Sequence, residues 1–169
     1  MLCSNGKLAM TSATPGKTRL VNHFNINGKW YLVDLPGYGY AKMPPQEKAK
    51  LEAIIRDYLN HSEELTALFI LVDCRHDVQK ADLDFLGEVG GSDIPFYIIF
   101  TKGDKLGPVA LQKRVEENVS QIREHLGKLY PGEEFQLKHF SSSAKSSLGR
   151  DEILSFIGEM LQQQTTTTT

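Results

Sequence analysis

Three short polar motifs stand directly after apolar runs of the sequence, and their side chains could bind a ligand. Asp34-Leu35-Pro36-Gly37 follows WYLV, Thr101-Lys102-Gly103-Asp104 follows PFYIIF, and Ser141-Ser142-Ser143-Ala144 follows FQLKHF. Such runs predict buried strands, and open α/β sheets bind ligands at the carboxyl ends of their strands. We therefore expect the three motifs to lie at one edge of a sheet.

Thr101 to Asp104 matches the [NT]KxD pattern that reads guanine in GTP-binding proteins. A carboxylate at Asp104 can accept hydrogen bonds from the ring N1–H and the exocyclic amine of guanine, a donor pair that adenine lacks. The Lys102 stem can cover the base plane. Taken alone, the segment fits a polar loop after a strand equally well.

Asp34 to Gly37 forms a DxxG, in which a carboxylate ends a strand and a glycine allows backbone to approach a ligand. Asp34 is placed to hold Mg²⁺, directly or through water. A turn in which Asp34 caps its own backbone is the alternative.

Ser141 to Ala144 begins a loop of small residues, and its last three residues, up to Lys145, read SAK. Such a loop can present backbone N–H groups to the carbonyl oxygen of the base. A serine-rich lead into a helix is the alternative. The order of DxxG, TKxD and SAK, each after a predicted strand, favours a GTPase-type domain.

Thr14-Pro15-Gly16-Lys17-Thr18 contains GKT but is not a P-loop, because GxxxxGK[ST] requires glycine at Thr11. We interpret this segment as a switch loop in which Thr18 or Thr14 joins the Mg²⁺ shell. A Pro-Gly turn before a strand is the alternative.

Apolar periodicity predicts an α/β domain with a largely parallel sheet. Asn27-Gly28 predicts an antiparallel hairpin. Predicted strands are Arg19 to Ile26, Lys29 to Asp34, Ala67 to Asp73, Pro95 to Thr101 and Phe135 to Ser141. Predicted helices are Pro44 to Leu59, Ala81 to Val89, Val109 to Leu129 and Arg150 to Leu161.

Composition is that of an ordinary globular domain. The 169 residues are 40% hydrophobic and 24% charged, with a net charge of −2 that excludes a global positive field for nucleic acid or membranes. Two distant cysteines and no long apolar run indicate a reduced, cytoplasmic protein without a membrane segment. We expect one domain over residues 1–161 and a disordered tail over 162–169.

The strings TSATPGKTRLVNHF, WYLVDLPGYGYAK, LVDCRHD, FTKGDK and SSAK resemble the EngB (YihA/YsxC) family of bacterial GTP-binding proteins, over Met1 to about Leu161. The resemblance implies a Ras-like P-loop GTPase fold that binds GTP or GDP with Mg²⁺. It also implies a role in large ribosomal subunit assembly, with pre-ribosomal rRNA or protein as partner, and in cell division and septation.

Carried over from the family, the switch contact with nucleotide falls on Gly16, Lys17, Thr18, Arg19 and Leu20, and Thr18 would bind Mg²⁺. Asp34, Leu35, Pro36 and Gly37 would sense the γ-phosphate. Thr101, Lys102, Gly103 and Asp104 would read guanine, and Ser141, Ser142, Ser143 and Ala144 would close over the base.

The sequence departs from the family pattern in three ways. It contains no GxxxxGKS, so we expect a truncated chain whose missing first strand leaves two sheet edges. Tyr38 stands where Ras-type enzymes have a water-orienting glutamine, so we expect slow hydrolysis. Gly103 is expected to loosen the guanine loop. The alternative function is a module that has lost nucleotide binding and acts only through protein or ribosome contacts.

Overall fold

The structure, a computed structural model, describes residue 2, residues 20–38 and residues 44–167. The chain divides into two compact units, which we call the hairpin unit, ending at Leu65, and the sheet unit, beginning at Thr66. The hairpin unit contains β1 (Asn22–Ile26), β2 (Trp30–Asp34) and α1 (Pro45–His61). The sheet unit contains β3 (Leu68–Asp73), α2 (Lys80–Gly90), β4 (Phe96–Thr101), η1 (Gly103–Lys105), α3 (Pro108–Leu129), β5 (His139–Ser141) and α4 (Arg150–Thr167).

In the hairpin unit, β1 and β2 pair antiparallel, with Ile26 opposite Trp30. Asn27 and Gly28 both have positive φ, at 54° and 67°. Two-residue hairpin turns with positive φ at both positions match the twist of the strands that they connect. The Asn25 side chain accepts a hydrogen bond from the Gly28 N–H at 2.8 Å and closes the turn. The hairpin predicted from Asn27-Gly28 is confirmed.

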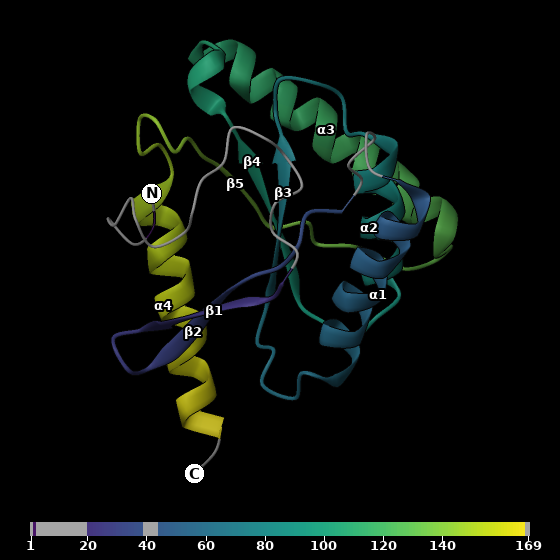
Figure 1. The fold of residues 1–169 in the computed structure, drawn as a ribbon. Helices are drawn as coiled ribbons and strands as arrows, with labels where there is room; N and C mark the ends of the chain where they lie inside the picture. Colours follow the sequence, from purple (N-terminus) through teal and green to yellow (C-terminus); the bar gives the residue numbers. More distant parts are fainter. Residues whose placement is uncertain (1, 3–19, 39–43, 168–169) are drawn as a thin grey trace. The chain divides into compact units, whose positions relative to one another are not determined.

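In the sheet unit, β3, β4 and β5 lie side by side in chain order and pair parallel. Each connection moves one strand further in the same direction, so right-handed crossovers place α2 and α3 on the same face. Figure 1 shows α2 and α3 on one side of these strands and α4 on the other.

The central strand β4 buries side chains on both faces. Ile98 and Phe100, which point to one face of β4, are fully buried, as are Leu86 of α2 and Ile122 of α3. Tyr97 points to the other face, where its ring packs edge-on against the ring of Phe156 of α4, with the ring centroids 4.7 Å apart. This burial on both faces explains why β4 is a continuous apolar run in the sequence.

Two boundaries differ from the predicted elements by four residues or more. β5 begins at His139 rather than Phe135, because the Lys138 N–H bonds within its own segment to the Gln136 carbonyl at 2.9 Å. α4 continues to Thr167, past the predicted end at Leu161 and into the predicted disordered tail, as its three glutamines are good helix formers. In the described part of the chain, the hairpin and the parallel strands form separate sheets.

Gly149, which precedes α4, occupies a position that only glycine suits. Its φ is +71°, and a Cβ there would collide with the Ser141 backbone carbonyl. Left-handed backbone costs a residue with a side chain about 1–2 kcal/mol, and the collision adds to this. We expect Gly149→Ala to lower the free energy of unfolding by at least about 2 kcal/mol in urea titrations.

The matched control is Gly158→Ala, in the middle of α4, where a Cβ would meet no atom within 4 Å. That substitution is expected to be neutral or to stabilise by up to about 1 kcal/mol, since alanine is the better helix former. Equal effects of the two substitutions would contradict this account of Gly149.

Candidate functional site

The TKGD motif makes a tight turn at the carboxyl end of β4. Thr101 is the last residue of the strand, and Lys102 has left-handed backbone (φ 64°, ψ 28°) that turns the chain into η1. The Lys105 N–H donates a hydrogen bond to the Lys102 carbonyl at 3.0 Å, which closes this turn. A lysine in this conformation is uncommon and marks a locally constrained backbone.

Gly103 is buried in the turn rather than loosening it, which corrects the expectation from the sequence. Its N–H donates to the Ser142 carbonyl at 2.9 Å. A Cβ at this position would come within 2.9 Å of a Leu148 methyl and 3.3 Å of the same carbonyl. A side chain at this position would therefore crowd Leu148 and the serine loop, which packs directly against the turn.

The serine loop after β5 reaches Asp104 through one short hydrogen bond. The Ser143 hydroxyl donates to Asp104 Oδ1 at 2.6 Å, and Ser143 is fully buried. The same hydroxyl oxygen accepts the backbone N–H groups of Lys145 and Ser146 at 3.1 and 3.2 Å. The structure thus brings two of the predicted site segments together.

The Asp104 carboxylate remains ionised and able to accept further hydrogen bonds. The Ser143 hydrogen bond lowers its pKa, while burial acts in the opposite direction. A carboxylate can accept about four hydrogen bonds, so capacity remains for a pair of donors on one ligand edge. That is the chemistry that a guanine base would use.

Asp73, at the end of β3, joins this site through Lys102. Its Oδ2 accepts hydrogen bonds from Lys102 Nζ and from Arg75 Nη2, both at 2.7 Å. Sequence reasoning placed Asp73 at a strand end, but it did not predict the contact with Lys102. The parallel pairing of β3 with β4 is the signal that could have suggested it.

The loop that follows Asp73 is attached to α3. The Asn118 side chain, which is 1% exposed, donates to the His76 carbonyl at 3.2 Å. The Gln121 side chain bonds both the N–H and the carbonyl of Val78, at 3.0 and 3.2 Å.

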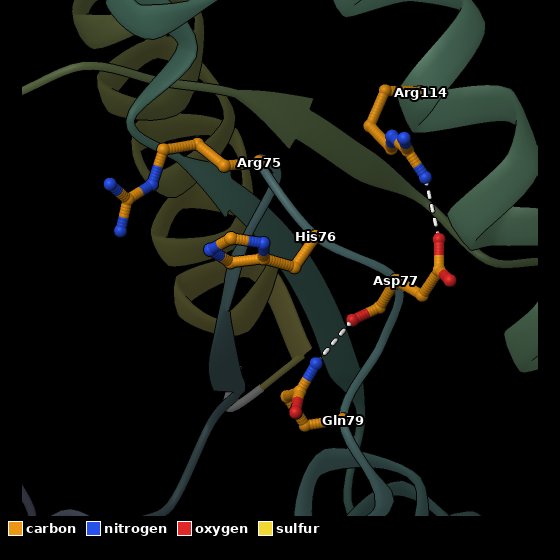
Figure 2. Close-up of a pocket in the computed structure, with 5 residues that line it drawn as sticks. All are labelled: Arg75, His76, Asp77, Gln79 and Arg114. Carbon is orange, nitrogen blue, oxygen red and sulfur yellow. Dashed lines mark hydrogen bonds and ion pairs between the residues drawn. The ribbon is translucent and has the colours of Figure 1, made fainter.

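Figure 2 shows the open polar pocket that this loop forms with α3, lined by Arg75, His76, Asp77, Gln79 and Arg114. Asp77 turns toward Arg114 and pairs with its guanidinium at 2.5 Å, whereas Arg75 points away from both. Asp77 in this pocket and Asp73 beside it thus each form an ion pair with an arginine.

The DxxG segment belongs to the hairpin unit. Asp34 is exposed at the end of β2, Leu35 is partly buried and Pro36 is buried. Gly37 is exposed, with open space where a Cβ would stand. The two ends of the segment, Asp34 and Gly37, are thus accessible, as contact with a phosphate would require.

Most of the predicted switch contact lies outside the described residues. Gly16, Lys17, Thr18 and Arg19 fall there, as does the alternative magnesium ligand Thr14. Leu20 is described and its side chain is 72% exposed.

Residues 20–38 and 44–167 contain no group of three or more His, Cys, Asp or Glu side chains able to hold a metal ion. Within those ranges, no helix has the length and hydropathy needed to cross a bilayer.

Residues 1–102 match the family model described as a 50S ribosome-binding GTPase. A probable GTP-binding protein EngB of Phocaeicola vulgatus is 47% identical over 157 residues, which are 93% of this chain and 75% of that protein. One from Porphyromonas gingivalis is 43% identical over 166 residues, or 98% of this chain and 79% of that protein.

Solved structures show the same fold. The crystal structure of a probable GTP-binding protein EngB superposes with a TM-score of 0.64 at 19% identity, over 94% of this chain and 88% of that one. Era, in complex with MgGDPNP and 16S ribosomal RNA, superposes with a TM-score of 0.61 at 21% identity, over 89% of this chain and 47% of Era. The expected Ras-like P-loop GTPase fold is confirmed, and the family match together with the identity to these relatives shows that this chain belongs to the EngB family of GTP-binding proteins.

Proposed function

We propose that this chain binds GTP and GDP as a nucleotide-dependent switch, reading the guanine base with Asp104. The observation that supports this most directly is the 2.6 Å hydrogen bond from Ser143 to Asp104, which joins the two loops predicted to surround the base. The bond fixes one carboxylate oxygen before any ligand arrives. Such preorganisation reduces the ordering that binding would otherwise require.

The other base contacts follow from the same two loops. The stem of Lys102, whose side chain is 51% exposed, would cover the base plane. Backbone N–H groups of the loop from Ser141 to Ala144 would face the base carbonyl oxygen. In the hairpin unit, Asp34 to Gly37 would sense the γ-phosphate, with Gly16 to Leu20 as the switch contact.

Mg²⁺ would be held by oxygen ligands that the structure only partly describes. Thr18 is the proposed hydroxyl ligand, and Asp34 would act directly or through water. Exposure of Asp34 at the end of β2 fits this role. Tyr38, next to Gly37, favours slow hydrolysis of GTP, because tyrosine cannot orient a water as glutamine does.

The biological role that we propose is assembly of the large ribosomal subunit, with an effect on cell division and septation. The match to a family described as 50S ribosome-binding GTPases supports a pre-ribosomal particle, rRNA or protein, as partner. Such a role would place the protein in the cytoplasm. Nucleotide state, sensed around Thr18 and Gly37, would set the affinity for that partner.

Binding of labelled nucleotides tests the proposal directly. We expect labelled GDP to bind saturably in a fluorescence titration and labelled ADP not to bind, because only guanine offers two adjacent donors to Asp104. Titrations with and without Mg²⁺ show whether the ion contributes to binding of the nucleotide phosphates. Absence of binding by either nucleotide would favour an interaction module that acts without nucleotide.

Asp104→Asn is expected to change base preference from guanine toward xanthine. An asparagine amide accepts only through its carbonyl, so GDP affinity should fall at least about tenfold, since a hydrogen bond to a charged group contributes roughly 1.5–3 kcal/mol. Xanthosine diphosphate should gain affinity, because its second carbonyl can accept from the amide. Competition titrations with both nucleotides measure the change.

Asp84→Asn is the matched control for Asp104, because it removes an exposed carboxylate that pairs with Lys80 on α2. It should leave the affinity for both nucleotides unchanged. An unchanged base preference in Asp104→Asn would show that Asp104 does not read the base.

Ser143→Ala is expected to weaken GDP binding about three- to tenfold and to lower the free energy of unfolding by about 1–3 kcal/mol. The substitution removes the hydroxyl from Asp104 and leaves the N–H groups of Lys145 and Ser146 without their acceptor. GDP titration and urea unfolding measure the two effects.

Ser155→Ala, at an exposed position of α4, controls for the loss of a hydroxyl. If Ser143→Ala matched this control in both measurements, the Ser143 hydrogen bond would not organise the site.

A further inference from the structure

Asp73 lies outside every motif assigned to nucleotide binding, yet its carboxylate is the partner of the Lys102 ammonium. We propose that Asp73 is a positioning residue that holds the Lys102 side chain for the guanine base, while Arg75 fixes the Asp73 carboxylate. This inference rests on the proposed function, and it adds a residue of β3 to the base-reading loops.

The backbone places Asp73 beside Lys102 with little freedom. Asp73 stands opposite Thr101 in the parallel pairing of β3 with β4. The Cys74 N–H donates to the Thr101 carbonyl at 3.1 Å, and the Thr101 hydroxyl donates to the Val72 carbonyl at 3.2 Å. The residues on both sides of Asp73 are thus tied to the residue that precedes Lys102.

Arg75 holds the Asp73 carboxylate in a two-point contact. Arg75 Nε donates to Oδ1 at 2.9 Å and Nη2 donates to Oδ2 at 2.7 Å. The Arg75 backbone N–H adds a third bond to Oδ1 at 3.1 Å. A bidentate contact of this kind fixes the plane of the carboxylate, so Oδ2 is aimed at Lys102 Nζ.

The environment keeps this ion pair intact. The hydrogen bonds from Arg75, and then those from Lys102, hold the Asp73 pKa well below its usual range, although burial opposes them. Asp73 therefore stays charged throughout the physiological range. Its side chain is only 28% exposed, so solvent and salt screen the pair less than they would on an open surface.

A held ammonium restricts the whole Lys102 side chain. Lysine has a long flexible stem, and ordering it on binding reduces affinity. Here the left-handed backbone fixes one end of the side chain and Asp73 fixes the other, while 51% of the side chain stays exposed. The stem is thus presented to a base before the base arrives.

Asp73→Asn tests the positioning role, because it removes the charge and keeps the shape. We expect GDP to bind about five- to tenfold more weakly than to the unmodified chain, with guanine still preferred over adenine. Lys102→Met removes the ammonium and keeps an apolar stem. In the Lys102→Met background, Asp73→Asn should cause no further loss, because the partner that Asp73 holds is already absent.

Asp77→Asn is the matched control, since Asp77 lies in the same loop but turns away from Arg75 and pairs with Arg114. It should leave GDP affinity unchanged. An equal loss from Asp73→Asn with and without Lys102 would overturn the proposal, because Asp73 would then act on the fold and not on Lys102. If the unmodified chain failed to bind GDP at all, the proposed function would fail and this inference with it.

NMR relaxation of the Lys102 ε-carbon provides a readout that needs no nucleotide. We expect restricted motion in the unmodified chain and free rotation in Asp73→Asn. Arg75→Met is a second variant that leaves the Asp73–Lys102 pair in place but releases the carboxylate. It should raise Lys102 mobility and weaken GDP binding two- to threefold. Lys102 motion that is the same in all three proteins would overturn the proposal.

Discussion

Parallel pairing of β4 with a strand on each side is the constraint on which the site depends. β3 and β5 run in the same direction as β4, so the segments that leave all three strands emerge at one edge. Backbone hydrogen bonds continue past the strand ends, from Cys74 to Thr101 and from Ser142 to Phe100. These hydrogen bonds hold the chain after each strand against β4, so the TKGD turn, the serine loop and Asp73 lie next to one another.

The polar side chain buried at this edge, Ser143, has hydrogen-bond partners, which favours one conformation of the serine loop. Ser143 has no exposed surface, yet its hydroxyl donates one hydrogen bond and accepts two. An unsatisfied group at such a position would cost about 1–3 kcal/mol, so the loop has one strongly preferred conformation. Gly103 completes the arrangement by allowing the Ser142 carbonyl to approach.

Each of the two carboxylates at the site is held by hydrogen bonds of defined direction. Lys102 and Arg75 both contact Asp73, and Asp104 is held by a neutral hydroxyl. The recognition that we propose at this edge would therefore depend on where donors and acceptors point more than on a local excess of one charge. This arrangement suits the edge of a base better than a phosphate, and it agrees with the roles that we propose, base reading for TKGD and phosphate sensing for DxxG.

Local patterns were enough to predict most helices, strands and the hairpin. Apolar runs and three- to four-residue spacing depend on neighbours in the chain, and Asn27-Gly28 selects its own turn. The motifs after β4 and β5 were found in the same way. Predictions failed where local sequence was ambiguous, as at the start of β5 and in the glutamine-rich end of α4.

The sequence by itself determined which segments are strands and helices, and which strand ends carry polar side chains. Only the tertiary structure decided that Asp73 holds Lys102, that Ser143 holds Asp104 and that Gly103 packs closely against Leu148 and the serine loop. Each of these contacts joins residues far apart in the chain, and each depends on distances of a few ångströms. Strand register and loop conformation set such distances, and no pattern of neighbouring residue types encodes them.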